Sequence, residues 1–269
     1  MDNVVKNTEE IKDLETMMQL VYLDFTSVNK DEKAVKTLID GVAMQLQNIH
    51  LSSPTVFEDS VMSTLYGNNP HFRIPSADAV RGISYDRVLE IARERTSNAN
   101  EWTFTIIGNF DEAALRPLVE QYLGALPSTG AATKGHDVST EFKGVVINDF
   151  TRKMETPKAI AVMVWADYEM DYSLQNIIRA SMAGQILTMI YTEKIREEAS
   201  AAYSVMAQAS LQRDDYKSAG LVLVYCPMKP EKGDVAIEIL RAEVEAMTKT
   251  CDADMLQKVK EYMLKNIDD

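Results

Sequence analysis

The sequence is short of the residues that build metal centres and disulfide frameworks. It has three histidines and two cysteines among 269 residues, too few cysteines for a disulfide scaffold of this length. The histidines are His50, His71 and His136, and none has a second histidine or a glutamate at a metal-binding spacing. Neither the direct nor the inverted two-histidine zinc motif is present. We therefore expect no metal ligand in this chain and interpret the histidines as solvated loop residues.

The motifs of common catalytic and nucleotide-binding sites are missing as well. The sequence contains no G-x-S-x-G, no C-x-x-C, no P-loop and no G-x-G-x-x-G, so it offers neither a recognisable nucleophile nor a phosphate cradle. The acidic stretch "DYEMD", residues 167–171, could pair two carboxylates as acid and base, but the helix dipole alone favours negative charge at the start of a helix. Cys226 lies in the apolar pattern "LVLVYCPM" and is interpreted as a small buried hydrophobe. We assign no catalytic residue.

Long apolar runs and an excess of positive charge are also absent. The longest clear apolar run, "AIAVMVWA" at residues 159–166, is far shorter than the roughly 20 residues that cross a bilayer. The formal net charge is −13, which repels the phosphates of nucleic acids. We therefore expect neither a membrane span nor a nucleic-acid partner. A basic or unfolded peptide suits this charge better.

The residues that are present suffice for a sizeable core, because 46% of them are hydrophobic. Apolar residues at helical spacing predict helices, with Ser84, Asp111 and Asp234 as candidate N-caps. The predicted helices cover 9–25, the stretch that follows residue 31, part of 52–70, 85–98, 112–127, 173–200, 233–249 and 252–269. Strands rich in β-branched and aromatic residues are expected over 101–110, 145–149, 157–168, 201–212 and 216–228.

These elements predict an α+β protein with two domains. A small, polar, turn-rich stretch at residues 129–143 reads as a linker. It separates a mostly helical first domain, residues 1–128, from a second domain, residues 144–269. The second domain is expected to hold a mixed sheet with helices on one face, and strand 157–168, apolar on both faces, is expected to be central.

One stretch, "TEKIREEASAAYSV" at residues 192–205, carries the candidate functional residues. Arg196 lies near the C-terminal end of the predicted long helix, and Tyr203 follows seven residues later in the predicted strand. A guanidinium and a phenol are hydrogen-bond donors that suit the carbonyl oxygens of an extended peptide. Alternatively, Arg196 pairs with a neighbouring glutamate (193, 197 or 198) and Tyr203 packs in the core. The spacing leaves both interpretations open.

Three segments resemble, in the same order, the C-terminal half of the pitrilysin/insulinase-type zinc peptidases, the inverzincin family. The stretch "IREEASAAYSV" resembles the R-E-x-x-G-x-A-Y-x-V segment of that half. The stretch "DLETMMQLVYLDFTSVNKDEKAV" resembles a segment late in the third domain. The stretch "YDRVLEIARERTSNANEWTFTIIGNFDEAALRPLVEQYLGALPS" resembles the helix, strand and helix that close such a domain.

The resemblance implies a clam-shell of two halves, each with two similar α+β domains. The N-terminal half of the family carries zinc on H-x-x-E-H, whereas the C-terminal half lacks zinc and holds the substrate backbone with an arginine and a tyrosine. By position these are Arg196 and Tyr203. The resemblance thus implies two α/β-sandwich domains of the metallohydrolase-like type, with the first one incomplete, and a chain that is a fragment.

One departure falls in the motif itself, because Ser200 stands where the family usually has glycine. Serine enters left-handed conformations less readily than glycine, so the corner could bend differently.

The leading hypothesis is a non-catalytic, substrate-binding portion of a zinc peptidase that cleaves peptides or unfolded proteins. The expected partner is a zinc-bearing half or subunit, and this chain alone is expected to be inactive and to need no cofactor of its own. Two rivals remain: a structural or regulatory interaction subunit of the same fold, and a free-standing acidic peptide-binding module. The resemblance suggests a bacterial periplasm or envelope, and exposed apolar helix faces could drive homo-oligomerisation.

Overall fold

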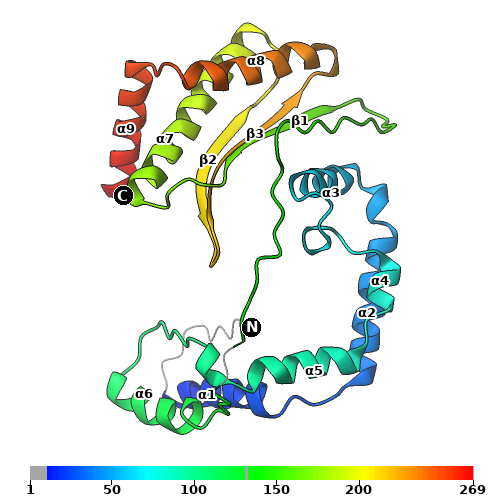
Figure 1. The fold of residues 1–269 in the computed structure, drawn as a ribbon, viewed down its shortest axis with the longest axis vertical. Helices are drawn as coiled ribbons and strands as arrows, with labels where there is room; N and C mark the ends of the chain where they lie inside the picture. The colour runs from blue at the N-terminus through cyan, green and yellow to red at the C-terminus, as the bar shows by residue number, and fades with distance from the viewer. Residues whose placement is uncertain (1–10, 131–132, 269) are drawn as a thin grey trace. The chain divides into compact units, whose positions relative to one another are not determined.

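The chain forms two compact units, residues 1–146 and 147–269. The structure is a computed structural model, and it describes residues 11–130 and 133–268 (Figure 1). The first unit is helical in its described part, and the sheet belongs to the second unit. The predicted α+β composition is therefore confirmed.

The first unit is a series of helices and short turns. The helices are α1 (Ile11–Thr26), α2 (Glu32–Gln47), α3 (Ser53–Leu65), α4 (Ala77–Arg81), α5 (Tyr85–Thr96) and α6 (Glu112–Leu118), with a wider π-type turn η4 (Val119–Leu123) and single turns η1 (Ile49–Leu51), η2 (Pro70–Phe72) and η3 (Ala99–Glu101). The two caps predicted for this unit are confirmed. Ser84 Oγ accepts a hydrogen bond from the amide of Arg87 at 3.3 Å, and Asp111 Oδ1 accepts one from the amide of Ala113 at 2.9 Å.

Packing in the first unit joins α1 to the helix that begins after Asp111. Met18 and Leu115 are buried, and the Tyr122 hydroxyl donates to Glu15 Oε1 at 2.9 Å. Pro117 lies inside α6 and cannot donate a backbone hydrogen bond, and the helix continues beyond it as the wider turn η4.

Some residues that helical periodicity assigns to the core are instead exposed. Leu89 is buried as predicted, but Leu38, Val88 and Ile91 are 65%, 46% and 42% exposed. The predicted apolar stripes are thus wider than the surface that these helices bury within the described part of the first unit.

The strand predicted over 101–110 is wrong. From Trp102 to Phe110 the chain forms no ladder, and Ile107 is 91% exposed. A strand needs a neighbour to pair its backbone groups, and no other strand lies in the described part of the first unit. Residue preference alone therefore does not make this segment a strand.

The second unit contains an antiparallel sheet and the helices that cover it. The strands are β1 (Ala159–Asp167), β2 (Met206–Arg213) and β3 (Ser218–Met228), and the helical segments are α7 (Leu174–Tyr191), the π-type turn η5 (Thr192–Glu198), η6 (Pro230–Lys232), α8 (Gly233–Met247) and α9 (Ala253–Asp268). The sheet order is β1-β3-β2. Val222 at the centre of β3 lies opposite Trp165 on one side and Ala209 on the other.

The core of the second unit lies between one face of this sheet and the helices α7 and α8, which cross that face in Figure 1. Side chains alternate between the two faces of a strand, so every second residue of β2 and β3 points at the helices. The buried residues of this core are Leu187, Tyr191, Ile195, Ala201, Ala202, Val205, Ala207, Val224, Cys226, Met228, Ala236 and Leu240.

Four further predictions for the second unit are wrong. Strand β1 lies at the edge of the sheet and β3 is central, because β3 follows β2 through a hairpin and pairs on both sides. Residues 145–149 form no strand. Asp234 does not cap α8, since Lys232 occupies the cap position and makes no side-chain cap bond. The sheet is antiparallel throughout its described strands and not mixed.

Candidate functional site

The candidate site lies where the long helix α7 ends. The helix widens into η5, where the amide of Ala199 donates to the carbonyl of Lys194 at 3.0 Å, five residues earlier. Ser200 then adopts a left-handed backbone with a φ of 49°. Positive φ is strained for a residue with a Cβ, and both π-type turns and strained residues are frequent at functional sites.

The two predicted site residues lie on either side of this turn. Arg196 is exposed within η5. Tyr203 is 90% exposed and precedes β2, so the expectation that it lies in the strand is wrong. The alternative interpretation, in which Tyr203 packs in the core, is excluded by the same exposure. Among the residues that the structure describes, Arg196 forms no ion pair with a neighbouring glutamate.

The backbone between the two residues is fixed by burial and by hydrogen bonds. Ala201 and Ala202 are buried, and the amide of Ala201 donates to the carbonyl of Ile195 at 2.8 Å. The segment that joins β3 to α8 supplies two more bonds. The amide of Lys229 donates to the carbonyl of Ala201 at 2.9 Å, and the ammonium of Lys232 donates to the carbonyl of Ala199 at 2.5 Å.

Contacts with α8 fix the helix that carries Arg196. The ammonium of Lys194 lies 2.6 Å from Glu243 Oε1, and the buried hydroxyl of Tyr191 donates to the carbonyl of Leu240 at 2.9 Å. Burial, followed by the nearby Glu243 and then Cys226, raises the pKa of Tyr191. Tyr191 therefore stays protonated as a structural donor.

The cysteines offer no activated nucleophile. Cys226 is fully buried, as predicted, and burial raises the pKa of its thiol to about 11. A thiol becomes reactive when its pKa is lowered, not raised. Cys251 is exposed.

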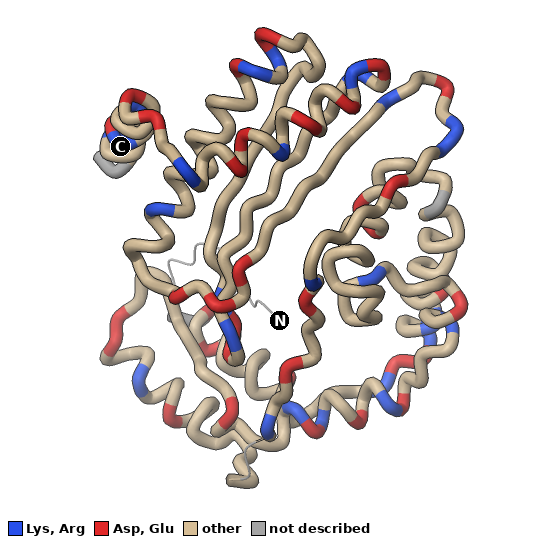
Figure 2. Tube along the Cα trace, turned by 45° about the horizontal axis from the view of Figure 1, so that its top comes forward, with Lys and Arg blue, Asp and Glu red and all other residues tan. Residues whose placement is uncertain are grey.

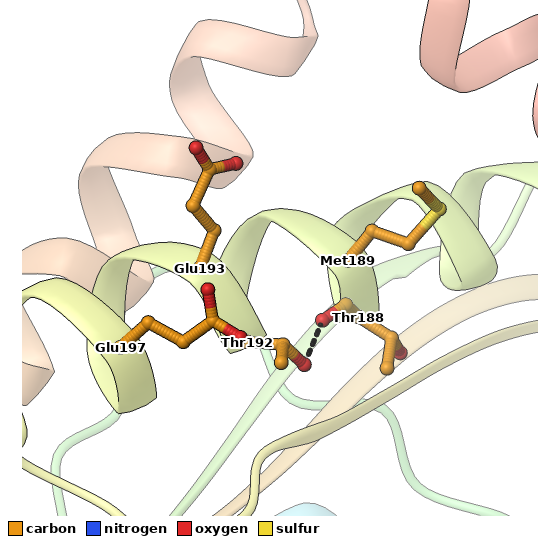
Figure 3. Close-up of a pocket in the computed structure, with 5 residues that line it drawn as sticks. All are labelled: Thr188, Met189, Thr192, Glu193 and Glu197. Carbon is orange, nitrogen blue, oxygen red and sulfur yellow. Dashed lines mark hydrogen bonds between the residues drawn. The ribbon is translucent and has the colours of Figure 1, made fainter.

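A shallow depression of about 330 Å³ lies along α7 and η5. Figure 3 shows its lining as a strip of helix, in which the hydroxyl of Thr192 donates to the carbonyl of Thr188 at 2.7 Å. Met189, Glu193 and Glu197 complete the lining. Arg196 and Tyr203 do not line it, so the structure does not gather the predicted pair into this depression.

No metal centre is found in the described part of the chain. Across residues 11–130 and 133–268, no three His, Cys, Asp or Glu side chains are placed to hold a metal ion. His71 and His136 are exposed, whereas the side chain of His50 lies outside the described residues. These residues do not fit a zinc ion.

Charge and apolarity set further bounds on the surface. Figure 2 shows acidic and basic residues interspersed along the helices, on a chain whose net charge is −13. In the described ranges, no helix combines the length and the apolar character that a bilayer crossing requires.

The hydrogen bond from Lys232 to Ala199 was not predicted from the sequence. Ala199 lies 33 residues away from Lys232, and neither residue belongs to a motif. A lysine at a strand-to-helix junction reads as a solvated charge, so no sequence signal could have identified this contact.

The sequence matches the protein family described as the peptidase M16 inactive domain over residues 82–263. A curated relative is the zinc protease PQQL-like protein of Arabidopsis thaliana. It is 30% identical over 118 residues, which are 44% of this chain and 12% of that protein.

Solved structures share the fold. The periplasmic protease PqqL from Escherichia coli superposes with a TM-score of 0.76 at 18% identity, over 96% of this chain and 28% of PqqL. The peptidase M16 inactive domain from Pseudomonas fluorescens gives a TM-score of 0.67 at 12% identity, over 98% of this chain and 63% of that one. The chain thus spans only part of the length of each relative.

Proposed function

The chain belongs to the family of peptidase M16 inactive domains, which matches residues 82–263, and from this membership we propose that it is the non-catalytic, substrate-binding portion of a zinc-dependent peptidase. The substrate is a peptide or an unfolded protein. The zinc and the residues that activate water belong to a separate N-terminal half or partner subunit, because the described residues of this chain hold no metal-binding group. This chain alone is inactive.

Within that assembly, Arg196 and Tyr203 bind the substrate backbone. The guanidinium and the phenol each donate hydrogen bonds to carbonyl oxygens of an extended peptide. Donors fixed before the reaction lower the barrier in two ways, since they position the peptide and stabilise the negative charge that develops on the scissile carbonyl oxygen. No step of this mechanism runs through a metal on the present chain.

The observation that carries the proposal is the difference in exposure between Tyr203 and the two residues before it. Ala201 and Ala202 are buried and hydrogen-bonded, whereas Tyr203, the next residue, is 90% exposed. An exposed aromatic ring beside a fixed backbone is available to a ligand. Arg196 is likewise exposed and free of ion pairs within the described residues, so its donors are also available.

The test measures peptide cleavage after this chain is assembled with its zinc-bearing half. We expect Arg196→Ala and Tyr203→Phe each to lower kcat/KM by roughly 10²-fold, the usual loss when one stabilising donor is removed. Two exposed residues elsewhere in the second unit provide matched controls, Arg241→Ala and Tyr216→Phe. Their rates should stay within about twofold of the parent. Equal rates for all four variants would remove Arg196 and Tyr203 from the mechanism.

A further inference from the structure

The corner between Arg196 and Tyr203 is held by one charged side chain from outside it. The ammonium of Lys232 donates to the carbonyl of Ala199 at 2.5 Å. Ala199 is the C-cap residue that directly follows η5, and Ser200, with its positive φ, comes next. The lysine therefore binds the backbone at the point where the helix ends and the strained turn begins.

The chemistry of this contact suits a lysine. The last carbonyls of a helix lack amide partners and carry the negative end of the helix dipole. A lysine ammonium satisfies such a carbonyl and interacts favourably with the dipole. Lys232 is half-buried, so water competes less for its ammonium than it would at an open surface.

The neighbouring bonds make the contact part of a clamp. The junction between β3 and α8 also pairs Met228 with Ala202 in an isolated β-bridge, and the amide of Lys229 donates to the carbonyl of Ala201. These backbone bonds hold Ala201 and Ala202, the two residues after Ser200. The side chain of Lys232 holds Ala199, the residue before Ser200 and next to the turn that carries Arg196.

We propose that Lys232 is a positioning residue for the Arg196–Tyr203 site. Its ammonium fixes the end of η5. It thereby keeps the guanidinium of Arg196 and the phenol of Tyr203 in positions from which both can bind the backbone of the same peptide. The proposal rests on the proposed function of that pair. Lys232 itself does not touch the substrate, and it acts through the backbone of Ala199 and Ser200.

The experiment compares Lys232→Met, Lys232→Arg and Lys249→Met in the assembled peptidase, with a fluorogenic peptide that the assembly cleaves. Lys249 lies just beyond the opposite end of α8 and forms an exposed ion pair with Glu245, so Lys249→Met controls for the loss of one positive charge. Circular dichroism on each variant checks that the second unit is folded.

We expect Lys232→Met to lower kcat/KM on the order of tenfold, mainly through kcat, because small misplacements of donors reduce rates steeply. Lys232→Arg should restore most of the rate, since arginine also donates to a carbonyl. Lys249→Met should match the parent. In an Arg196→Ala background, Lys232→Met should lower the rate by a smaller factor than in the parent, because only Tyr203 is then left for it to position and residues that act through one another are not additive.

The outcomes separate the two proposals. If Arg196→Ala and Tyr203→Phe reduce turnover but Lys232→Met behaves like Lys249→Met, the positioning role is wrong and the substrate-binding role stands. A loss of rate in Lys232→Met that is fully additive with Arg196→Ala also overturns positioning, since it points to general destabilisation. If Arg196→Ala and Tyr203→Phe leave turnover unchanged, the substrate-binding role fails and the positioning role fails with it.

Discussion

Gly184 and Ala209 bring helix α7 and strand β2 into direct backbone contact. A Cβ placed on Gly184 would lie 2.6 Å from the amide nitrogen of Ala209, which is closer than non-bonded atoms approach. One turn later, the hydroxyl of Thr188 accepts the amide of Ala207 at 3.0 Å. The absence of a side chain at Gly184 thus sets how closely the helix that carries η5 lies against the sheet.

We expect Gly184→Ala to destabilise the second unit by about 1–3 kcal/mol, the usual cost of forcing an extra group into a packed site. The obstacle is backbone, which cannot rotate away as a side chain can. Gly41 provides the matched control, because it also lies inside a helix and a Cβ there meets nothing within 4 Å. Gly41→Ala should stabilise by about 0.5–1 kcal/mol. Urea unfolding of the two variants measures both effects, and a neutral Gly184→Ala would contradict this account of the packing.

Glycine is expected to fit the backbone conformation at position 200 better than the native Ser200 does. Its φ of 49° strains any residue with a Cβ, whereas glycine adopts it freely. Part of this gain is offset by the larger conformational entropy of glycine in the unfolded chain. Ser200→Gly should therefore raise the free energy of unfolding by about 0.5–1 kcal/mol.

Ala199 is the natural control for Ser200, because it is adjacent and has an ordinary φ of −76°. Ala199→Gly should lower the free energy of unfolding by about 0.5–1 kcal/mol. Thermal unfolding of the two variants gives opposite shifts if the left-handed turn is strained. Shifts of the same sign would show that the backbone at Ser200 carries no strain.

The two cysteines should differ in reactivity towards a thiol reagent at pH 8. Cys251 is exposed and Cys226 is buried, and burial raises the pKa of the Cys226 thiol to about 11. The thiolate is the reactive form. Mass spectrometry should find one label per native chain and two in denaturant. Cys251→Ala should abolish labelling of the native protein, and rapid native labelling of Cys226 would contradict its burial.

Stability is expected to fall as the pH rises from about 9 to 11. Burial raises the pKa of Cys226 from its ordinary 9.0 to about 11, and it also raises the pKa of Tyr191 above its ordinary value of 10.0. In this range the folded state binds more protons than the unfolded state, so the free energy of unfolding decreases with pH. Below pH 9 the contribution of both groups is fully present.

Substitution of either buried group tests this slope. Tyr191→Phe and Cys226→Ala remove one titrating group each, so their free energies of unfolding should fall less steeply between pH 9 and 11. Tyr216→Phe, at an exposed position, should keep the parent slope. Urea unfolding at a series of pH values measures all four proteins, and identical slopes would disprove the assignment to Tyr191 and Cys226.

The family resemblance and much of the local structure were readable from the sequence. The match to the peptidase M16 inactive domain over residues 82–263 confirms the family, and it covers two of the three segments that carry the resemblance. The caps at Ser84 and Asp111 are confirmed, because a cap depends on a side chain and an amide two or three residues away. The burial of Cys226 is confirmed too, since its strand is apolar around it.

The predictions that were wrong concern partners distant in the sequence. Residues 101–110 have strand-forming side chains, yet a strand exists only where another backbone pairs with it. Strand β1 is apolar on both faces but lies at the edge, because the order of strands is set by connections and not by composition. Val88 satisfies helical spacing but is 46% exposed, since burial requires a neighbour to cover it.

The sequence by itself therefore determined most helices, most strands of the second unit and the family, and it indicated the two residues that are proposed to bind substrate. Only the tertiary structure decided that Tyr203 is exposed beside buried alanines, that Ser200 is left-handed and that Lys232 reaches Ala199. The physical reason is range. Periodicity and caps record interactions within a few residues along the chain. The turn at residues 199–202 is instead shaped by bonds to residues 228–232, across 25 or more residues of intervening chain.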